Sequence, residues 1–377
     1  MGIIKKLTHR NKVTYNLFGI TLCKITRNYD YKIKNIAGIY KKIKKYKGYK
    51  ETRIIKIFNL KIYRRIEDLY EINYSILKII NWKTNKENRL KKDLKQIIKS
   101  KYNKIFILKS NLGEAYIFLK FIINGLLNKT DIPLIITTKK YHINLINMLV
   151  PEIKSIYKPN LKYETSNKVI KINNKYIYTA FPMKFYIDTE HKIQEGNSHY
   201  LSEIYNYFLI SKENTPVKNK IKISSETQKK ISEYLKEQRI NKYIFLSTEA
   251  TTCENINETF WENLAKELQL KIVKNNPERS IEEAYCLAQN AQFVISLRSG
   301  LSEILSNNDN TQIVIYTKFK KRYRFDEISG NKIAKGYSIK ELEPNKKNLY
   351  EIEYKKDNEV AIIDWIKEIV NMRVKIS

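Results

Sequence analysis

The chain has 377 residues, of which 42% are hydrophobic, and it carries a formal net charge of +32 at pH 7. This length predicts two or three domains, and the apolar share is enough for packed cores, which excludes a disordered chain. No stretch reaches the roughly 18 uncharged apolar residues that cross a bilayer, and residues 1–10 lack the apolar segment of a signal peptide. The three cysteines lack the paired spacing of a zinc site or a disulfide framework. A reduced, cytoplasmic protein is therefore expected.

Basic residues are concentrated in the N-terminal third of the chain. Residues 1–100 hold 27 Lys and Arg against 7 Asp and Glu, a net charge of +20, and the other 277 residues carry the remaining +12. AT-rich codons encode Lys, Asn, Ile and Tyr, so genome composition explains part of this excess. The uneven distribution instead favours an anionic partner, which is a membrane surface, a phosphorylated glycolipid or nucleic acid.

The first hundred residues contain two similar stretches, residues 15–25 and residues 55–65. Each alternates apolar residues and ends in basic ones, which predicts a strand or one arm of a hairpin. Between them, residues 41–48 are strongly basic, and we expect a helix or a loop there. The simplest interpretation of this basic segment is a solvated face. The alternative is an arm that lies on an anionic membrane, where each nearby Lys or Arg adds about 1 kcal/mol.

From about residue 88 the pattern becomes one of short buried strands and amphipathic helices. Strand, turn, helix and strand at this spacing form a βαβ unit, which implies a parallel sheet. The expected elements are helices over 88–101, 115–127 and 141–149 and strands over 104–109 and 132–137.

A polar stretch over residues 211–222 is expected to link this unit to a second α/β series. The second series has helices over 225–238, 257–268, 281–290 and 301–306, strands over 243–247, 270–274, 293–297 and 312–316, and a last helix over 360–370. The predicted fold class is therefore α/β, with two Rossmann-like parallel-sheet domains that face each other across a cleft. The carboxyl ends of the strands are expected to line this cleft.

The first of three turns at strand ends is Ser110-Asn-Leu-Gly-Glu114. Gly113 permits a tight turn into the helix, and the amides that follow Asn111 are available to an oxyanion. Glu114 at the helix start can act as a general base if it faces the cleft. The alternative, which the local sequence favours, is a first-turn residue that complements the helix dipole.

The second turn covers residues 247–252 and contains Ser247, Thr248 and Ala250. Small and hydroxylated residues before a helix can hold a nucleotide or phosphate with backbone donors. They are also ordinary helix-capping residues. This turn alone does not decide between nucleotide binding and helix capping.

The third turn, residues 296–303, carries Arg298, Ser299, Gly300 and Glu303. A guanidinium, a hydroxyl and the amides of a helix start together suit a diphosphate, and Glu303 can accept hydrogen bonds from a sugar or ribose. The alternative is a salt bridge between Arg298 and Glu303 that caps the helix. Of the two, we favour the binding site.

The order of these motifs resembles the heptosyltransferase-like glycosyltransferases, which form family 9 of the two-domain class GT-B. Residues 112–114 are similar to the Leu-Gly-Asp turn of that family, and residues 199–210 to its interdomain helix. Residues 244–250 with 260–265, and 280–291 with 294–305, are similar to the start and the end of its donor domain. The resemblance covers about residues 100–320.

The chain departs from this family at two places. The family commonly has Asp-Ser/Thr-Gly-x-x-His at the last turn, where this chain has Arg298-Ser-Gly-Leu-Ser-Glu303. The lysine that heptosyltransferases often place just after the second turn is also missing. The Arg-Ser-Gly-Leu turn looks more like a branch among capsule and lipopolysaccharide glycosyltransferases, so ADP-, GDP- and UDP-linked sugars are equally open as donors.

The charge distribution, the pattern of elements and the resemblance together predict four segments. They are a basic N-terminal extension over 1–95, an acceptor domain over 96–212, a donor domain over 213–350 and a C-terminal helix over 351–377. The resemblance also implies transfer of a sugar from a nucleotide-sugar to a glycan or glycolipid acceptor, with inversion. No metal and no cofactor are expected, since the nucleotide-sugar is a substrate.

In this reading Glu114 is the catalytic base, and Asn111 and Gly113 form the acceptor-side turn. The donor-binding residues are Ser247, Thr248, Ala250, Arg298, Ser299, Gly300 and Glu303. The basic N-terminal third would hold the protein as a peripheral partner of the inner membrane face. The alternative function is a basic nucleic-acid-binding protein without catalytic activity, which the absence of a recognition motif disfavours.

Overall fold

The structure is a computed structural model that describes the backbone of nine strands within residues 5–85 and most of the chain from residue 92 on. Described in full are residues 92–161, 169–182, 185, 188–189, 192–193, 195–210, 219–318 and 333–373, and in backbone alone residues 330–332 and 374. The chain divides into two units, Met1–Ser100 with Lys162–Asn167, and Lys101–Leu161 with Lys168–Ser377. The finer domain boundaries expected from the sequence stay predictions.

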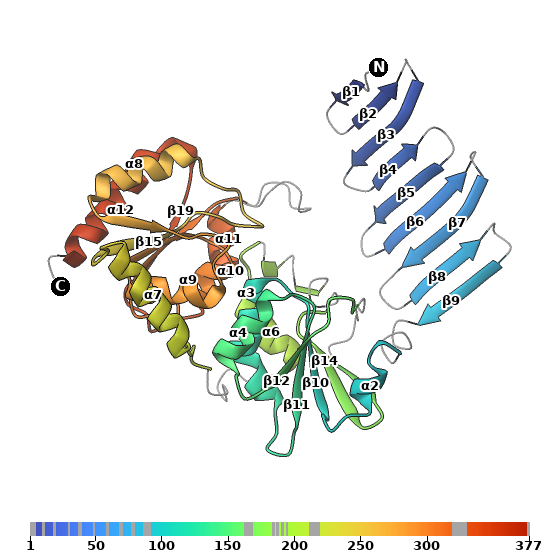
Figure 1. The fold of residues 1–377 in the computed structure, drawn as a ribbon, viewed down its shortest axis with the longest axis horizontal. Helices are drawn as coiled ribbons and strands as arrows, with labels where there is room; N and C mark the ends of the chain where they lie inside the picture. Colours follow the sequence, from blue (N-terminus) through green and yellow to red (C-terminus); the bar gives the residue numbers. More distant parts are fainter. Residues whose placement is uncertain are drawn as a thin grey trace. The chain divides into compact units, whose positions relative to one another are not determined.

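The first unit contains a nine-stranded antiparallel meander in which each strand pairs with the next along the chain (Figure 1). Its strands are β1 (Lys5–His9), β2 (Lys12–Leu17), β3 (Ile20–Asn28), β4 (Tyr31–Ile36), β5 (Tyr40–Lys47), β6 (Lys50–Ile57), β7 (Leu60–Glu67), β8 (Glu71–Ile76) and β9 (Ile80–Asn85). The strands expected within 15–25 and 55–65 are confirmed as parts of β2, β3, β6 and β7.

The helix or loop expected over residues 41–48 is wrong, because this segment forms β5. Tyr40, Ile43 and Tyr46 recur every three residues, which imitates a helical period. Pairing with β4 on one side and β6 on the other nevertheless places it in the sheet. Of the helix expected over 88–101, residues 88–91 lie outside the described residues; the described part has helical residues at 92–93 and α2 (Lys95–Ile98), with a turn at residue 94 between them.

The first sheet of the second unit has the order β12-β11-β10-β14-β13. Its strands are β10 (Lys104–Leu108), β11 (Pro133–Thr137), β12 (Lys154–Tyr157), β13 (Val169–Ile172) and β14 (Lys175–Thr179), and all but β13 are parallel. The helix expected after β10 is confirmed, but its form changes along its length. It runs as α3 (Leu112–Ile117), the π-helical η1 (Phe118–Ile122) and the 3-10 helix η2 (Ile123–Leu126). Further helices of this half are α4 (Tyr141–Leu149) and α6 (Tyr200–Phe208).

The second sheet of this unit is wholly parallel, with the order β16-β15-β17-β18-β19. Its strands are β15 (Tyr243–Ser247), β16 (Lys271–Lys274), β17 (Phe293–Leu297), β18 (Thr311–Tyr316) and β19 (Leu349–Glu353), and its helices are α7 (Ser225–Glu237), α8 (Glu258–Leu268), α9 (Ile281–Asn290), α10 (Gly300–Leu305), α11 (Gly330–Tyr337) and α12 (Glu359–Val374). Two parallel α/β sheets confirm the predicted fold class.

Alternate residues of β15 in the second sheet pack into two separate cores. Phe245 of β15 belongs to a core that continues through α9 and α3 into Phe106 of the first sheet. Ile244 and Leu246 point to the other face, where α8 and α12 lie side by side (Figure 1) and bury Trp261. The two sheets of this unit therefore share one core and hold their loops in a fixed relation. Within the described residues, no helix is long and apolar enough to span a membrane.

Candidate active site

The turn after β10 places Glu114 at the start of α3. The carboxylate of Glu114 accepts a hydrogen bond from the backbone amide of Asn111 at 2.6 Å, as expected for a first-turn acid that caps its helix. Lys139, which follows β11, donates from Nζ to the carbonyl oxygen of Ser110 at 2.6 Å. It also lies 3.3 Å from Asn111 Oδ1. The neighbouring strand thus supplies a cation to the turn that carries Glu114.

Charges interact across this turn. Burial lowers the pKa of Lys139, and the nearby Glu114 carboxylate opposes that shift. Burial and Glu114 together raise the pKa of the Tyr141 hydroxyl. The sequence analysis missed Lys139 and Tyr141. The available signal was that they directly follow a strand parallel to β10, and parallel neighbours end at the same edge of a sheet.

The third turn follows β17, whose five residues are all buried. Ser299 is the N-cap of α10: its Oγ accepts a hydrogen bond from the amide of Ser302 at 3.3 Å, and its own amide donates to Ser302 Oγ at 2.8 Å. Gly300 opens the helix. Arg298, just before the cap, is therefore fixed by a buried strand on one side and a capped helix on the other.

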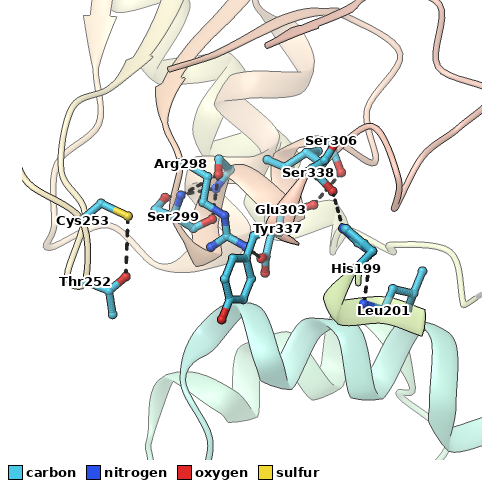
Figure 2. Close-up of polar contacts among 12 residues, drawn as sticks. His199, Leu201, Thr252, Cys253, Arg298, Ser299, Glu303, Ser306, Tyr337 and Ser338 are labelled. Carbon is cyan, nitrogen blue, oxygen red and sulfur yellow. Dashed lines mark hydrogen bonds and ion pairs between the residues drawn. The ribbon is translucent and has the colours of Figure 1, made fainter. Parts of the chain in front are cut away.

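Arg298 and Glu303 form a buried ion pair (Figure 2). Their side chains are 12% and 2% exposed. The guanidinium also lies over the ring of Tyr337, 5.3 Å from its centroid. This pair is the salt bridge that the sequence offered as the alternative to a binding site. In this structure the Glu303 carboxylate is the ion-pair partner of the Arg298 guanidinium.

The ion pair leaves two polar atoms unsatisfied. Arg298 Nε and Glu303 Oε2 are buried without a hydrogen-bond partner among the described residues. Burial raises the pKa of Glu303, with the attraction of Arg298 opposing and the charge of Glu114 adding to the shift. Burial alone would lower the pKa of Arg298, but Glu303 reverses this, so the guanidinium stays charged. Unpaired buried donors and acceptors cost folding energy and call for an explanation.

The first and third turns meet at two glycines. A Cβ added to Gly113 would overlap Glu303 Oε2 and would lie 3.0 Å from Gly300 Cα. A Cβ added to Gly300 would lie 3.2 Å from Gly113 Cα. Only residues without a side chain allow this approach. The structure therefore brings Glu114 of the first turn together with Arg298 and Glu303 of the third turn, at the place where the two sheets meet.

The second turn lies at the end of β15, beside β17. Ser247 pairs with Ser296 in the sheet, and Ser247, Thr248 and Ala250 are all buried. The amide of Ala250 donates to Asn255 Oδ1 at 3.2 Å. The capping interpretation of this turn is wrong, because α8 starts at Glu258 and its cap is Asn257, whose Oδ1 accepts from Thr259 N at 3.4 Å.

A polar network holds the segment after α11 against the start of α6 and against β18 and β19. His199 Nε2 lies 3.0 Å from the carbonyl oxygen of Ser338 (Figure 2). Ser338 Oγ donates to Glu351 at 2.8 Å, and Tyr316 OH donates to the same carboxylate at 2.6 Å. These contacts position Tyr337 against Arg298. No sequence pattern indicated Tyr337, because no element was expected between residues 317 and 350.

In the part of the chain that the structure describes, no group of three or more His, Cys, Asp or Glu side chains is placed to hold a metal ion.

Comparisons with known proteins find solved structures of low sequence identity. No protein-family model matches the sequence, and no curated protein matches it. A family 9 glycosyl transferase from Veillonella parvula is 8% identical over 74% of this chain and 99% of its own, with a TM-score of 0.48. The ADP-heptose lipopolysaccharide heptosyltransferase II of E. coli is 10% identical over 72% of this chain and 98% of its own, with a TM-score of 0.43. The E. coli heptosyltransferase WaaC, solved with ADP, is 10% identical over 71% and 99%, with a TM-score of 0.38. These proteins are glycosyltransferases of the family that the sequence resembles.

Proposed function

We propose that this chain is a nucleotide-sugar-dependent glycosyltransferase that acts on a bacterial surface glycan, either lipopolysaccharide or capsule. One observation carries the proposal. A carboxylate from the first sheet, Glu114, and a guanidinium from the second, Arg298, are brought to the edge where two parallel α/β sheets meet. Open parallel sheets bind ligands at the carboxyl ends of their strands.

The donor diphosphate would take the place of Glu303 on Arg298. The guanidinium stays charged and has an unsatisfied Nε, so it can form a bidentate pair with a phosphate. Glu303 Oε2, also unsatisfied, would accept a hydrogen bond from a donor hydroxyl. The buried turn of Ser247, Thr248 and Ala250 would complete the donor side, together with Ser299 and Gly300. Admission of the donor requires Gly113 and Gly300 to separate.

The transfer itself needs a base and a stabilised leaving group. The acceptor oxygen attacks the anomeric carbon while the bond from that carbon to the diphosphate oxygen breaks. Glu114 takes the proton of the acceptor hydroxyl, and Arg298 stabilises the charge that develops on the leaving diphosphate. A single displacement of this kind inverts the anomeric configuration. In this mechanism, Asn111 and Gly113 shape the acceptor side, and Lys139 holds the turn on which Glu114 lies.

A thermal-shift screen against ADP-, GDP-, UDP- and CMP-sugars tests the donor site. A ligand at a hundred times its dissociation constant stabilises the folded state by about 2.7 kcal/mol. We expect stabilisation by one nucleotide class, lost in the double variant Arg298→Gln/Glu303→Gln, which leaves no buried charge unpaired. Arg279→Ala, a cation that follows β16 at the same edge of the sheet, is the control and should keep the shift.

The same screen separates the proposal from nucleic-acid binding. Stabilisation by polynucleotides alone, with a steep salt dependence, would contradict the glycosyltransferase and favour the alternative function. A thermal shift with a nucleotide-sugar that persists in the Arg298→Gln/Glu303→Gln variant would show that the donor binds elsewhere.

A further inference from the structure

Five basic residues occupy directly opposite positions in five neighbouring strands of the first unit. Arg27 of β3 pairs with Lys32 of β4, Lys32 with Lys44 of β5, Lys44 with Arg53 of β6, and Arg53 with Arg65 of β7. We call these five residues the basic row. Residues that pair directly share one face of a sheet, so the basic row lies on a single face.

The basic row places like charges side by side. Neighbouring strands are about 4.8 Å apart, which is shorter than the Debye length of about 8 Å at physiological salt. Like charges directly opposite each other destabilise a sheet. On the other face of the same strands, the longest such run is shorter: Lys41, Lys56 and Lys61. An anionic partner along the basic row would turn this repulsion into attraction.

The same face is mostly apolar where the basic row ends. Arg65 pairs with Tyr74 of β8, and Tyr74 with Trp82 of β9. Because residues two apart in a strand share a face, Ile72, Ile76, Ile80 and Thr84 lie on this face as well, and the paired Glu51 and Glu67 lie on it beside the basic row. The positions on the opposite face of β8 and β9 are polar: Glu71, Asn73, Ser75, Asn81, Lys83 and Asn85.

We propose that this face of the meander binds the surface of an anionic lipid bilayer. Lys and Arg are attracted to anionic headgroups, and Tyr and Trp are enriched at the membrane–water interface. A linear polyanion such as a nucleic-acid strand would account for the basic row, but it gives no role to the three isoleucines beside Tyr74 and Trp82. The face carries both features that an anionic bilayer recognises. The proposal is independent of the transfer reaction, since no residue of the candidate active site takes part.

Co-sedimentation of the full-length protein with vesicles tests it. Vesicles of phosphatidylcholine with phosphatidylglycerol are compared with vesicles of phosphatidylcholine alone. Each cation at an anionic surface changes binding about fivefold, so neutralising four residues of the row should weaken binding at least about a hundredfold. The row variant is Lys32→Gln, Lys44→Gln, Arg53→Gln, Arg65→Gln; the matched control removes four charges from the opposite face, Lys41→Gln, Lys45→Gln, Lys56→Gln, Arg64→Gln.

The control variant should lose less than about tenfold, because its residues lie on the face away from the lipid. Equal losses in the two variants would overturn the proposal and leave only unspecific charge attraction. Equal binding of the wild type to both kinds of vesicle would also overturn it. The proposal would also be overturned if polyuridylate bound the wild type through the basic row while anionic vesicles bound neither the wild type nor the row variant. The row variant keeps the far-UV circular dichroism of the wild type, since it removes like-charge repulsion from the sheet.

Tryptophan fluorescence gives a second, structural readout. Trp82 is the one tryptophan of the meander, and the other two, Trp261 and Trp365, lie in the second unit. With brominated phosphatidylcholine in the anionic vesicles, we expect quenching in the wild type and its loss in Trp82→Phe. Quenching that persists in Trp82→Phe would show that another part of the chain meets the lipid and would contradict the assignment of this face.

Discussion

Lys120 offers the sharpest test of how the two sheets of the second unit are held together. It lies in η1, is 3% exposed, and donates from Nζ to Tyr116 OH at 2.9 Å. It also binds Asn307 Oδ1 and the Glu343 carboxylate, which belong to the other half of this unit. The ammonium thus joins the helix after β10 to the loops around β18.

Replacing Lys120 by Met keeps the apolar stem and removes the charge. Loss of one partner from a buried ion pair costs about 3–5 kcal/mol. Glu343 retains 18% side-chain exposure, and it also interacts with the charge of Lys346. We therefore expect Lys120→Met to lower the free energy of unfolding by about 3 kcal/mol, the low end of this range. The loss is measured from a lower midpoint of urea unfolding.

The control is the double variant Lys120→Met/Glu343→Gln, which leaves no carboxylate unpaired. Removing both charges should recover most of the loss and leave a cost of about 1 kcal/mol. The double-mutant cycle, completed by the single variant Glu343→Gln, then gives a coupling of at least about 2 kcal/mol. Additive single-variant costs, or a Lys120→Met cost below about 1 kcal/mol, would refute the reasoning that this pair ties the two halves together.

Three further predictions follow from the site. Gly113→Ala pushes a methyl group into Glu303 and should cost about 1–3 kcal/mol in unfolding experiments, whereas Ala at the exposed Gly125 should cost less than half of that. His142 is buried, and burial lowers its pKa to about 4. Because the unfolded chain takes up this proton below its ordinary pKa of about 6.5 and the folded chain does not, the stability present above pH 6.5 should fall towards pH 4, less steeply in His142→Gln. Glu114→Gln should lower the rate of sugar transfer about a hundredfold or more while the donor-induced thermal shift stays; loss of both would make Glu114 a binding residue instead of the base.

The strands of the second unit that carry a clear apolar run follow from the sequence, and the others do not. Strands β15 and β17 and helices α4 and α9 begin and end at the predicted residues, because each strand is a continuous buried run and each helix has a clear apolar stripe. The interior strand β14 and the edge strands β12, β13 and β19 were missed. None of these four is a continuous buried run, so no apolar run marks them.

The candidate site also has a part that the sequence predicts and a part that depends on tertiary packing. Arg298 and Glu303 lie five positions apart on one turn, so both of their possible roles could be written down from the sequence. Their contact with Gly113 joins segments almost two hundred residues apart and depends on how the two sheets pack. Lys139 could have been found from its place directly after β11, whereas Tyr337 reaches the site through tertiary structure alone, and local sequence patterns carry no information about that approach.

The release of nucleoside diphosphate tests the central claim most directly. The protein is incubated with each nucleotide-sugar and an extract of bacterial surface glycan, and both the released diphosphate and the labelled glycan are measured. We predict equal amounts of the two for one donor class, and none in Glu114→Gln or in Arg298→Gln/Glu303→Gln. Wild-type protein that binds a nucleotide-sugar but produces neither diphosphate nor labelled glycan would contradict the assignment of this site to sugar transfer.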